Sequence, residues 1–470
     1  MVIGTRDQPS GARGHHPPGP VIEGVSGRCD RYDPNPVLNR LDLRGRQGGF
    51  ADVLPRPRLD GEGPVAAVRS ILAEVRSRGD TALREFTARF DGVELDSIRV
   101  SGAEFDRAES EVSGEVRSAL VEAHAAISEF HLSEVRERHT WCREGVSVTG
   151  WNQPVDRAGV YVPGGLAVYP STVLMTAVPA RAAGVPEVVM CVPPAADGTV
   201  PAPCLVAARM AGVSEVYKVG GAQAVGAMAY GTESVAPVDV IAGPGNRYVA
   251  IAKREVSGVV GVPSAFAGPS EIVVIADGTV PDTSAAVDVI VQAEHGPDGL
   301  AWLVTWEPDV ADAVCERITE MVSASSRVES IRSTLSEGGY AVLVDGPEQA
   351  IAVANAVAPE HLELMCAEPR TLLRLVRHAG AVFLGPWSPA SIGDYVAGPS
   401  HVLPTMSTAR FSGALTVDDF QKRMHAIEVS EEAFDRLAPV VATLARVEGL
   451  EAHAASVAER RAWAQGGFRP

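Results

Sequence analysis

The chain has 470 residues, of which 46% are apolar and 21% are charged, and its formal net charge is −18. This length predicts two or more domains, and the composition is ordinary for a soluble globular protein. The negative balance argues against nucleic acid or an anionic membrane as a partner, because both require a positive surface. A small anionic ligand remains compatible, since a local patch or a helix N-terminus can bind it.

The six cysteines form no C-x-x-C pair and no even framework. Reduced thiols in a cytoplasmic protein are therefore the prediction. No stretch approaches the ~20 apolar residues of a membrane span. The N-terminus has no apolar core of the kind that a secretory signal carries.

The first part of the chain changes character twice. Residues 1–36 are rich in Gly, Pro, Arg and His and are predicted to be a disordered extension, followed by a short segment at 37–60. Residues 64–92 and 102–140 carry apolar residues at three- and four-residue spacing with charges between them, which predicts helices.

From residue 159 onward charges thin out, and short apolar runs alternate with Ala-rich stretches. This pattern predicts a parallel sheet covered by helices on both faces, with ligands at the carboxyl ends of its strands. The predicted strands are 187–192, 215–219 and 238–242, and the predicted helices are 201–212, 222–230 and 246–257.

The same alternation then repeats and predicts a second α/β unit. Its predicted strands are 272–276, 301–305, 341–344 and 381–384, and its predicted helices are 284–295, 308–322, 347–357 and 369–379. Beyond residue 413 apolar strand runs are lacking, which predicts an arm of short elements with a helical stretch at 430–465.

Two glycine turns follow predicted strands and open predicted helices, at 220–223 and 243–246. Glycine there lets the backbone approach a ligand, and a helix N-terminus favours phosphate. The full dinucleotide fingerprint is absent, because no third glycine follows Gly245. Two tight turns explain the pattern as well as cofactor binding does, and Tyr161 at another strand end either stacks on a ring or caps the core.

Polar clusters at element ends suggest an enzyme. Gln292 and His295 share one helix face at i, i+3 spacing, and one carboxylate and one more imidazole would complete a metal site. Glutamine is an unusual ligand, so Gln292 alone is weak support. Glu360 and His361 follow a proline and suit acid–base work, although they could equally be an N-cap pair of a helix.

Taken together, these blocks resemble the histidinol dehydrogenase family from about residue 41 to residue 453. The motifs that carry the resemblance are YVPGG from Tyr161, GGAQA from Gly220, GTES from Gly231, GPGN from Gly243, AGPSE ending at Glu271, QAEHGPD from Gln292, PEHL from Pro359, GDY from Gly393 and HVLPT from His401.

The resemblance implies an NAD-dependent, zinc-requiring oxidation of L-histidinol to L-histidine through the aldehyde, in histidine biosynthesis. The implied metal ligands, for one Zn²⁺ per subunit of a homodimer, are Gln292, His295, Asp394 and His453 of the partner subunit. Glu360 and His361 are implied as the acid–base pair, and Tyr161, Gln223 and Asn246 as NAD contacts. The implied substrate contacts are Ser270, His361, Glu448 and the four metal ligands.

The resemblance also implies two incomplete Rossmann-like domains with parallel-sheet cores, which accounts for the missing glycine fingerprint. Residues 61–160 with 271–412 are expected to form the first domain. Residues 161–270 are expected to form the second, on the NAD side. Residues 413–470 are expected to form a helical dimerisation arm that exchanges between subunits.

Two positions depart from the family pattern. Ser264 stands where an acidic residue is usual, and Ser400 stands where an asparagine is common. These departures keep open an alternative, a relative that oxidises another small amino alcohol or a hydroxymethyl compound such as a sulfonated diol. A catalytically silent metal- or nucleotide-binding protein ranks last, because Glu360, His361 and the implied ligands are all present.

Overall fold

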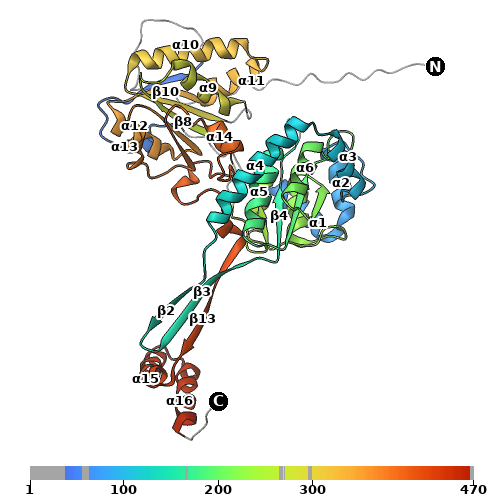
Figure 1. The fold of residues 1–470 in the computed structure, drawn as a ribbon, viewed down its shortest axis with the longest axis vertical. Helices are drawn as coiled ribbons and strands as arrows, with labels where there is room; N and C mark the ends of the chain where they lie inside the picture. Colours follow the sequence, from blue (N-terminus) through green and yellow to red (C-terminus); the bar gives the residue numbers. More distant parts are fainter. Residues whose placement is uncertain are drawn as a thin grey trace, which may run out of the picture.

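The computed structural model describes residues 37–55, 63–164, 168–263, 268, 270–294 and 299–465. The predicted extension at residues 1–36 lies outside these ranges. The described chain forms two α/β lobes and an arm that projects from them (Figure 1). The predicted fold class, mixed α/β with parallel sheets and a helical C-terminal region, is confirmed.

The first lobe, lobe A, is built on a six-stranded parallel sheet in the order β1-β10-β9-β8-β11-β12. Both central strands β8 and β9 are buried along their whole length. A strand covered on both faces needs apolar residues throughout, which explains the continuous apolar runs in the sequence. The strands are β1 (Asn39–Asp42), β8 (Glu271–Ala276), β9 (Leu300–Thr305), β10 (Gly339–Leu343), β11 (His361–Met365) and β12 (Ala381–Leu384).

Successive residues of a strand point to opposite faces, so the side chains of each strand in lobe A pack into two separate hydrophobic cores. Ile272 and Val274 join a core on the face of α9 (Asp282–Ala293), whereas Val273 and Ile275 join a core on the face of α12 (Pro347–Val357). The remaining helices of this lobe are α10 (Pro308–Ala324), α11 (Val328–Gly338), α13 (Pro369–Leu373) and α14 (Ala390–Tyr395).

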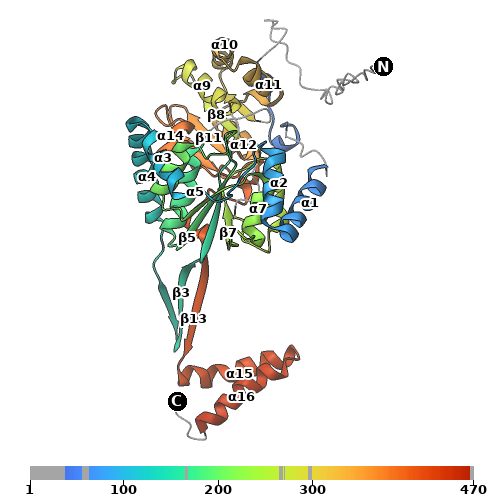
Figure 2. The same cartoon turned by 90° about the vertical axis from the view of Figure 1, so that its right-hand side faces the viewer.

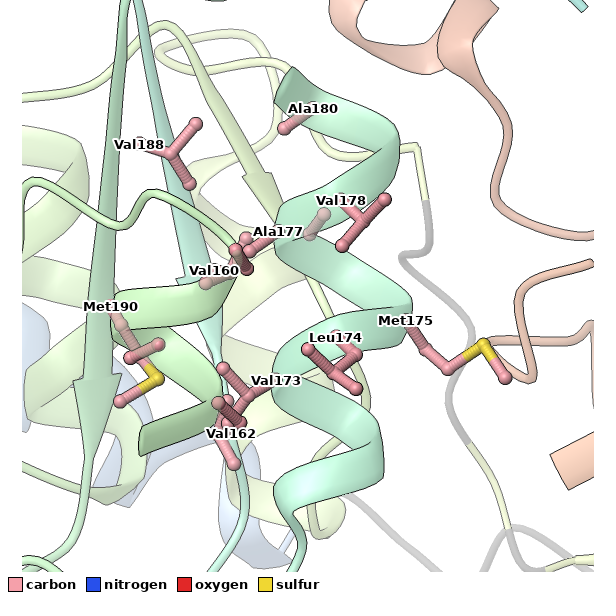
Figure 3. Close-up of a cluster of buried hydrophobic side chains, with 14 of the residues drawn as sticks. Val160, Val162, Val173, Leu174, Met175, Ala177, Val178, Ala180, Val188 and Met190 are labelled. Carbon is pink, nitrogen blue, oxygen red and sulfur yellow. The ribbon is translucent and has the colours of Figure 1, made fainter. Parts of the chain in front are cut away.

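The second lobe, lobe B, holds a four-stranded parallel sheet in the order β6-β5-β4-β7. Figure 3 shows one of its cores, in which Val160 of β4 and Met190 of β5 lie against Val173 and Leu174 of α5. The elements are β4 (Arg157–Tyr161), β5 (Glu187–Val192), β6 (Glu215–Lys218), β7 (Val240–Ala242), α5 (Pro170–Ala182), α6 (Ala202–Met210), α7 (Gly221–Tyr230) and α8 (Arg247–Val256).

The helices that precede β4 also belong to lobe B, which corrects the expectation that residues 61–160 join residues 271–412. Apolar residues of α1, such as Val68 and Leu72, share a buried core with Val225 of α7. On the other face, Leu120 and Ile127 of α4 share a core with α5. These helices are α1 (Gly63–Arg78), α2 (Asp80–Phe90), α3 (Gly102–Glu111) and α4 (Gly114–Ser133).

The arm begins as a three-stranded antiparallel ribbon in the order β13-β3-β2 and ends in two helices (Figures 1 and 2). Its elements are β2 (His139–Arg143), β3 (Val146–Pro154), β13 (Gln421–Val429), α15 (Glu431–Val447) and α16 (Glu451–Gln465). The expected helix through residue 140 and the expected lack of strands beyond 413 are therefore wrong. β2 is exposed along its whole length and β13 along nearly all of it, so no apolar run or alternation marks them in the sequence.

The five cysteines in the described ranges are all free thiols. None of the described helices is both long and apolar enough to cross a membrane.

Candidate active site

The predicted acid–base residues lie at the amino edge of the lobe A sheet. His361 is the first residue of β11 and pairs with Ile272 of β8 and Ala381 of β12. The two residues therefore do not cap a helix, which removes that alternative. Ligands at the carboxyl ends of strands were expected for the sheet of residues 187–242, whereas Glu360 and His361 lie at the amino end of a strand of the other sheet.

The side chains of Glu360 and His361 are almost completely buried, with 8% and 4% of each residue exposed. Glu360 Oε2 accepts a hydrogen bond from the Glu271 amide at 3.0 Å. His361 Nδ1 lies 3.3 Å from the Glu271 carbonyl and 3.7 Å from Glu360 Oε2. The start of β8 thus fixes the carboxyl group and the ring beside each other.

This environment shifts the pKa values of both groups. Burial raises the pKa of the Glu360 carboxyl to about 7, against the opposing effect of His361. Burial disfavours the charged ring of His361, but the Glu360 and Asp394 carboxylates outweigh it and raise the pKa of His361 to about 9. Two adjacent groups that titrate near or above neutrality suit proton transfer to and from a substrate.

Two of the predicted metal ligands meet at His361. Gln292, near the end of α9, places Nε2 3.3 Å from His361 Nδ1, and Asp394 of α14 places Oδ1 3.4 Å from His361 Nε2. Gln292 Oε1 is buried and has no hydrogen-bond partner among the described residues. A buried amide oxygen without a partner could accept a hard or borderline cation such as Zn²⁺.

The other predicted metal ligands, and the predicted substrate contact Glu448, are not brought to this point. His295 lies outside the described residues. Glu448 and His453 are exposed residues of the arm, whose helices α15 and α16 lie far from lobe A (Figure 2). Among the described residues, no three His, Cys, Asp or Glu side chains gather as a metal site.

Further residues at the site were not assigned a role from the sequence. His401 places Nδ1 3.0 Å from the Asp394 carbonyl and Nε2 3.1 Å from Thr172 Oγ1 of lobe B, so it bridges the lobes. The Phe383 ring stacks on His361 at 5.9 Å. His401 could be found in the sequence from the HVLPT motif and from its place at an element end, whereas no local signal marks Phe383.

A cavity of about 390 Å³ lies between the lobes and is lined by Ser270, Glu360 and His401. The predicted substrate contact Ser270 thus shares a cavity with the predicted acid–base residue Glu360. Ser400 is buried, donates to the Met175 carbonyl at 2.8 Å and accepts from the Val402 amide at 3.2 Å. Its hydroxyl therefore supports the loop, and Ser264 lies outside the described residues.

A larger cavity, of about 970 Å³, opens at the carboxyl edge of the lobe B sheet. All three predicted NAD contacts, Tyr161, Gln223 and Asn246, line it. The N-termini of α7 and α8 both open beside it, and Asn246 caps α8 by accepting from the amides of Tyr248 and Val249. Two helix N-termini at one cavity fit the phosphates of a dinucleotide.

The two glycine turns lie at the two cavities: Gly221 lines the larger one, and Gly243 and Gly245 line the smaller one. Gly243 has φ +107°, and a Cβ atom there would lie 2.2 Å from the Tyr161 carbonyl oxygen, so only glycine fits. The Tyr161 hydroxyl accepts from the Gly221 amide at 3.1 Å, and burial raises the pKa of this phenol. Tyr161 is only 3% exposed, so it orders the turn as well as lining the cavity.

The fold joins two lobes with parallel sheets, and it places a cavity of about 970 Å³ on lobe B and the buried Glu360–His361 pair on lobe A. Together with the family match, this arrangement identifies the class as a two-lobed oxidoreductase. The chain belongs to the histidinol dehydrogenase family, whose model, described as histidinol dehydrogenase, matches residues 54–461.

Individual relatives agree with this assignment. The chain is 47% identical to the histidinol dehydrogenase of Geobacillus kaustophilus over 84% of this chain and 93% of that one. It is 49% identical to that of Symbiobacterium thermophilum over 84% and 91%. The crystal structure of the Elizabethkingia anophelis histidinol dehydrogenase superposes with a TM-score of 0.87 at 32% identity, covering 92% of this chain and 99% of that one.

Proposed function

We propose that this protein oxidises L-histidinol to L-histidine through the aldehyde, with NAD as the hydride acceptor and Zn²⁺ at the site. The observation that carries the proposal is the buried pair Glu360–His361 held between Gln292 and Asp394 beside the cavity that Ser270 lines. Membership of the histidinol dehydrogenase family supports the substrate.

Glu360 and His361 would each carry out a different proton transfer. Hydride leaves a CH–OH carbon only if a base accepts the hydroxyl proton. His361 would accept it in its neutral form, which is the minor form near neutral pH because its pKa is raised to about 9. The aldehyde must then be hydrated before a second hydride leaves. Glu360, with a pKa raised to about 7, would accept the proton of that water.

The metal would be held by Gln292, His295 and Asp394, together with His453 of the partner subunit, at one Zn²⁺ per subunit. The buried, unpartnered Gln292 Oε1 supports a cation at this point. Zn²⁺ would supply a fixed point for the amino and ring nitrogens of histidinol. Ser270 and Glu448 would contact the substrate beside the four ligands.

NAD would occupy the larger cavity of lobe B, with Tyr161, Gln223 and Asn246 in contact. The N-termini of α7 and α8, which open beside this cavity, support the proposal, because helix N-termini favour phosphate groups. NAD would supply the hydride acceptor for both oxidation steps.

A homodimer in which the arms exchange would place Glu448 and His453 at the opposite subunit's site. The arm exposes large apolar side chains, among them Ile427 at 71%, Val447 at 82% and Trp141 at 53%. Contiguous exposed apolar surface of this kind marks protein interfaces, and an uncovered ribbon is marginally stable. A two-fold dimer would cover it.

Mixed dimers test the donation of His453. Inactive His453→Ala protein mixed with inactive His361→Asn protein should regain activity after subunit exchange. Each mixed dimer then has one site with both lesions and one with neither, so equal mixing should restore roughly a quarter of the wild-type activity. Verified mixed dimers without any recovery would place His453 in its own subunit's site.

The second candidate function is oxidation of another small amino alcohol or of a hydroxymethyl compound such as a sulfonated diol. The sequence observation that favours it is Ser264 in place of the usual acidic residue, because loss of a negative charge would favour an anionic substrate. NADH formation against a panel of amino alcohols and diols separates the two. Turnover of a diol without turnover of histidinol would replace the first proposal with the second.

A further inference from the structure

Behind the catalytic residues lies a second pair of buried acids, Asp288 and Glu363. Only 7% and 1% of these residues are exposed. Glu363 follows His361 by two positions in β11, so the two side chains leave the same face of the strand. Asp288 precedes Gln292 by four positions in α9, so it lies one helical turn below it on the same side.

The two carboxyl groups lie within hydrogen-bonding distance of each other. Glu363 Oε1 accepts the Ala390 amide at 2.6 Å, whereas no donor in the described part of the chain reaches Glu363 Oε2. Two ionised carboxylates would repel each other here, so a proton must lie between them. Burial raises the pKa of both groups, and the neighbouring Asp288 raises the pKa of Glu363 further. The hydrogen bond with Glu363 acts in the opposite direction on Asp288 and lowers its pKa.

We propose that the Asp288–Glu363 acid pair, joined by one proton, positions the metal-binding side chains. The hydrogen bond between the two carboxyls ties α9, which carries Gln292, to β11, which carries His361. The bond from the Ala390 amide ties the start of α14, which carries Asp394, to the same strand. This inference rests on the proposed function, because it assumes that the site holds Zn²⁺.

The pair therefore acts through other residues. Neither acid lines either cavity, and neither carboxyl is placed to touch the substrate. Groups that orient metal ligands from behind commonly change metal affinity by about 10- to 100-fold when they are lost. The pair acts through a hydrogen bond between its two side chains. An amide side chain can form the same hydrogen bond, so it should substitute for either acid without loss of function.

Two substitutions of Glu363 separate hydrogen bonding from mere space filling. In Glu363→Gln, the amide oxygen can still accept from Ala390 and the amide NH₂ can donate to the Asp288 carboxylate. We expect its Zn²⁺ dissociation constant, measured by competition with a chromophoric chelator, to stay within about 3-fold of the wild-type value. In Glu363→Met, which keeps the volume, we expect Zn²⁺ binding to weaken by about 10-fold or more.

Hydrogen exchange of the metal-free protein gives a second readout. The Ala390 amide should exchange faster in Glu363→Met than in the wild type, and at the wild-type rate in Glu363→Gln. This measurement needs no zinc. If the wild-type protein binds no Zn²⁺, the metal proposal fails, but the exchange rates still show whether the Asp288–Glu363 pair holds the Ala390 amide. If Glu363→Met does not fold, Asp288→Ala against Asp288→Asn provides the same contrast.

Asp277 offers a matched control at the opposite edge of the same sheet. It is also buried, and its carboxylate accepts from the Thr279 and Ala367 amides at 3.0 Å, tying the carboxyl ends of β8 and β11. Asp277→Leu should leave Zn²⁺ affinity unchanged. Equal Zn²⁺ affinity and equal Ala390 exchange in Glu363→Met and wild type would overturn the proposal, as would a loss in Glu363→Gln as large as in Glu363→Met.

Discussion

Replacement of His361 by asparagine is expected to slow the oxidation of both histidinol and histidinal, by about 10²- to 10⁴-fold in kcat. Asparagine has a similar size and can keep a hydrogen bond to the Glu271 carbonyl, but it cannot accept a proton. Initial rates of NADH formation from each compound measure the two steps separately. His124→Asn, on helix α4 and away from both cavities, is the matched control and should keep the wild-type rates.

Glu360→Gln should slow histidinal oxidation more than histidinol oxidation, because activation of water belongs only to the aldehyde step. The amide also removes the negative charge that helps to raise the pKa of His361. Some loss in the alcohol step is therefore expected as well. Small and equal effects of either substitution on both steps would contradict this division of roles.

Removal of the metal is expected to have the second large effect on enzymatic activity. Prolonged chelation should abolish activity, and addition of Zn²⁺ should restore it, with about one Zn²⁺ bound per subunit at full activity. Gln292→Ala and Asp394→Ala should each weaken Zn²⁺ binding, because they remove an oxygen ligand. Metal content by elemental analysis, followed against activity during dialysis, measures both.

The matched control for the ligand substitutions is Asp282→Ala, at the opposite end of α9 from Gln292. Its carboxylate pairs with Arg317 on the surface of lobe A. It should leave the metal content unchanged. Full activity of protein that has been shown to be free of metal would contradict the zinc proposal.

Strands that are apolar throughout could be predicted from the sequence. The structure places β5 at Glu187–Val192 and β12 at Ala381–Leu384, which are the predicted bounds. The strand β11 was not predicted, although it lies inside the sheet. Its sequence, HLELM, carries His361 and Glu363 on one face, and the polar residues of the site interrupt the apolar run.

The position of the N-terminal helices could not be predicted for a different reason. An amphipathic pattern shows that a helix has an apolar face, but not which of two sheets that face covers. The contact between α1 and α7 joins segments about 150 residues apart, as Leu72 and Val225 show. The ribbon of the arm was missed because its strands have no buried face within this subunit.

The candidate site could be predicted where motifs carried it. Gln292, Glu360 and Asp394, which come from three of the motifs, all lie within 3.7 Å of His361, and their roles stay predictions. Their supports could not be predicted, because the Glu271 amide, the Asp288 carboxyl and the Ala390 amide come from three separate segments. The parallel pairing of β8 with β11 places Glu271 beside Glu360 and His361, whereas Asp288 and Ala390 approach β11 from α9 and α14.

The most direct test of the proposed function is the number of NADH molecules formed per histidinol consumed, with the product identified by mass spectrometry. A four-electron oxidation at one site predicts two NADH per histidinol and L-histidine as the product, with little free histidinal. One NADH per histidinol with histidinal accumulating, or no NADH from histidinol at all, would contradict the account.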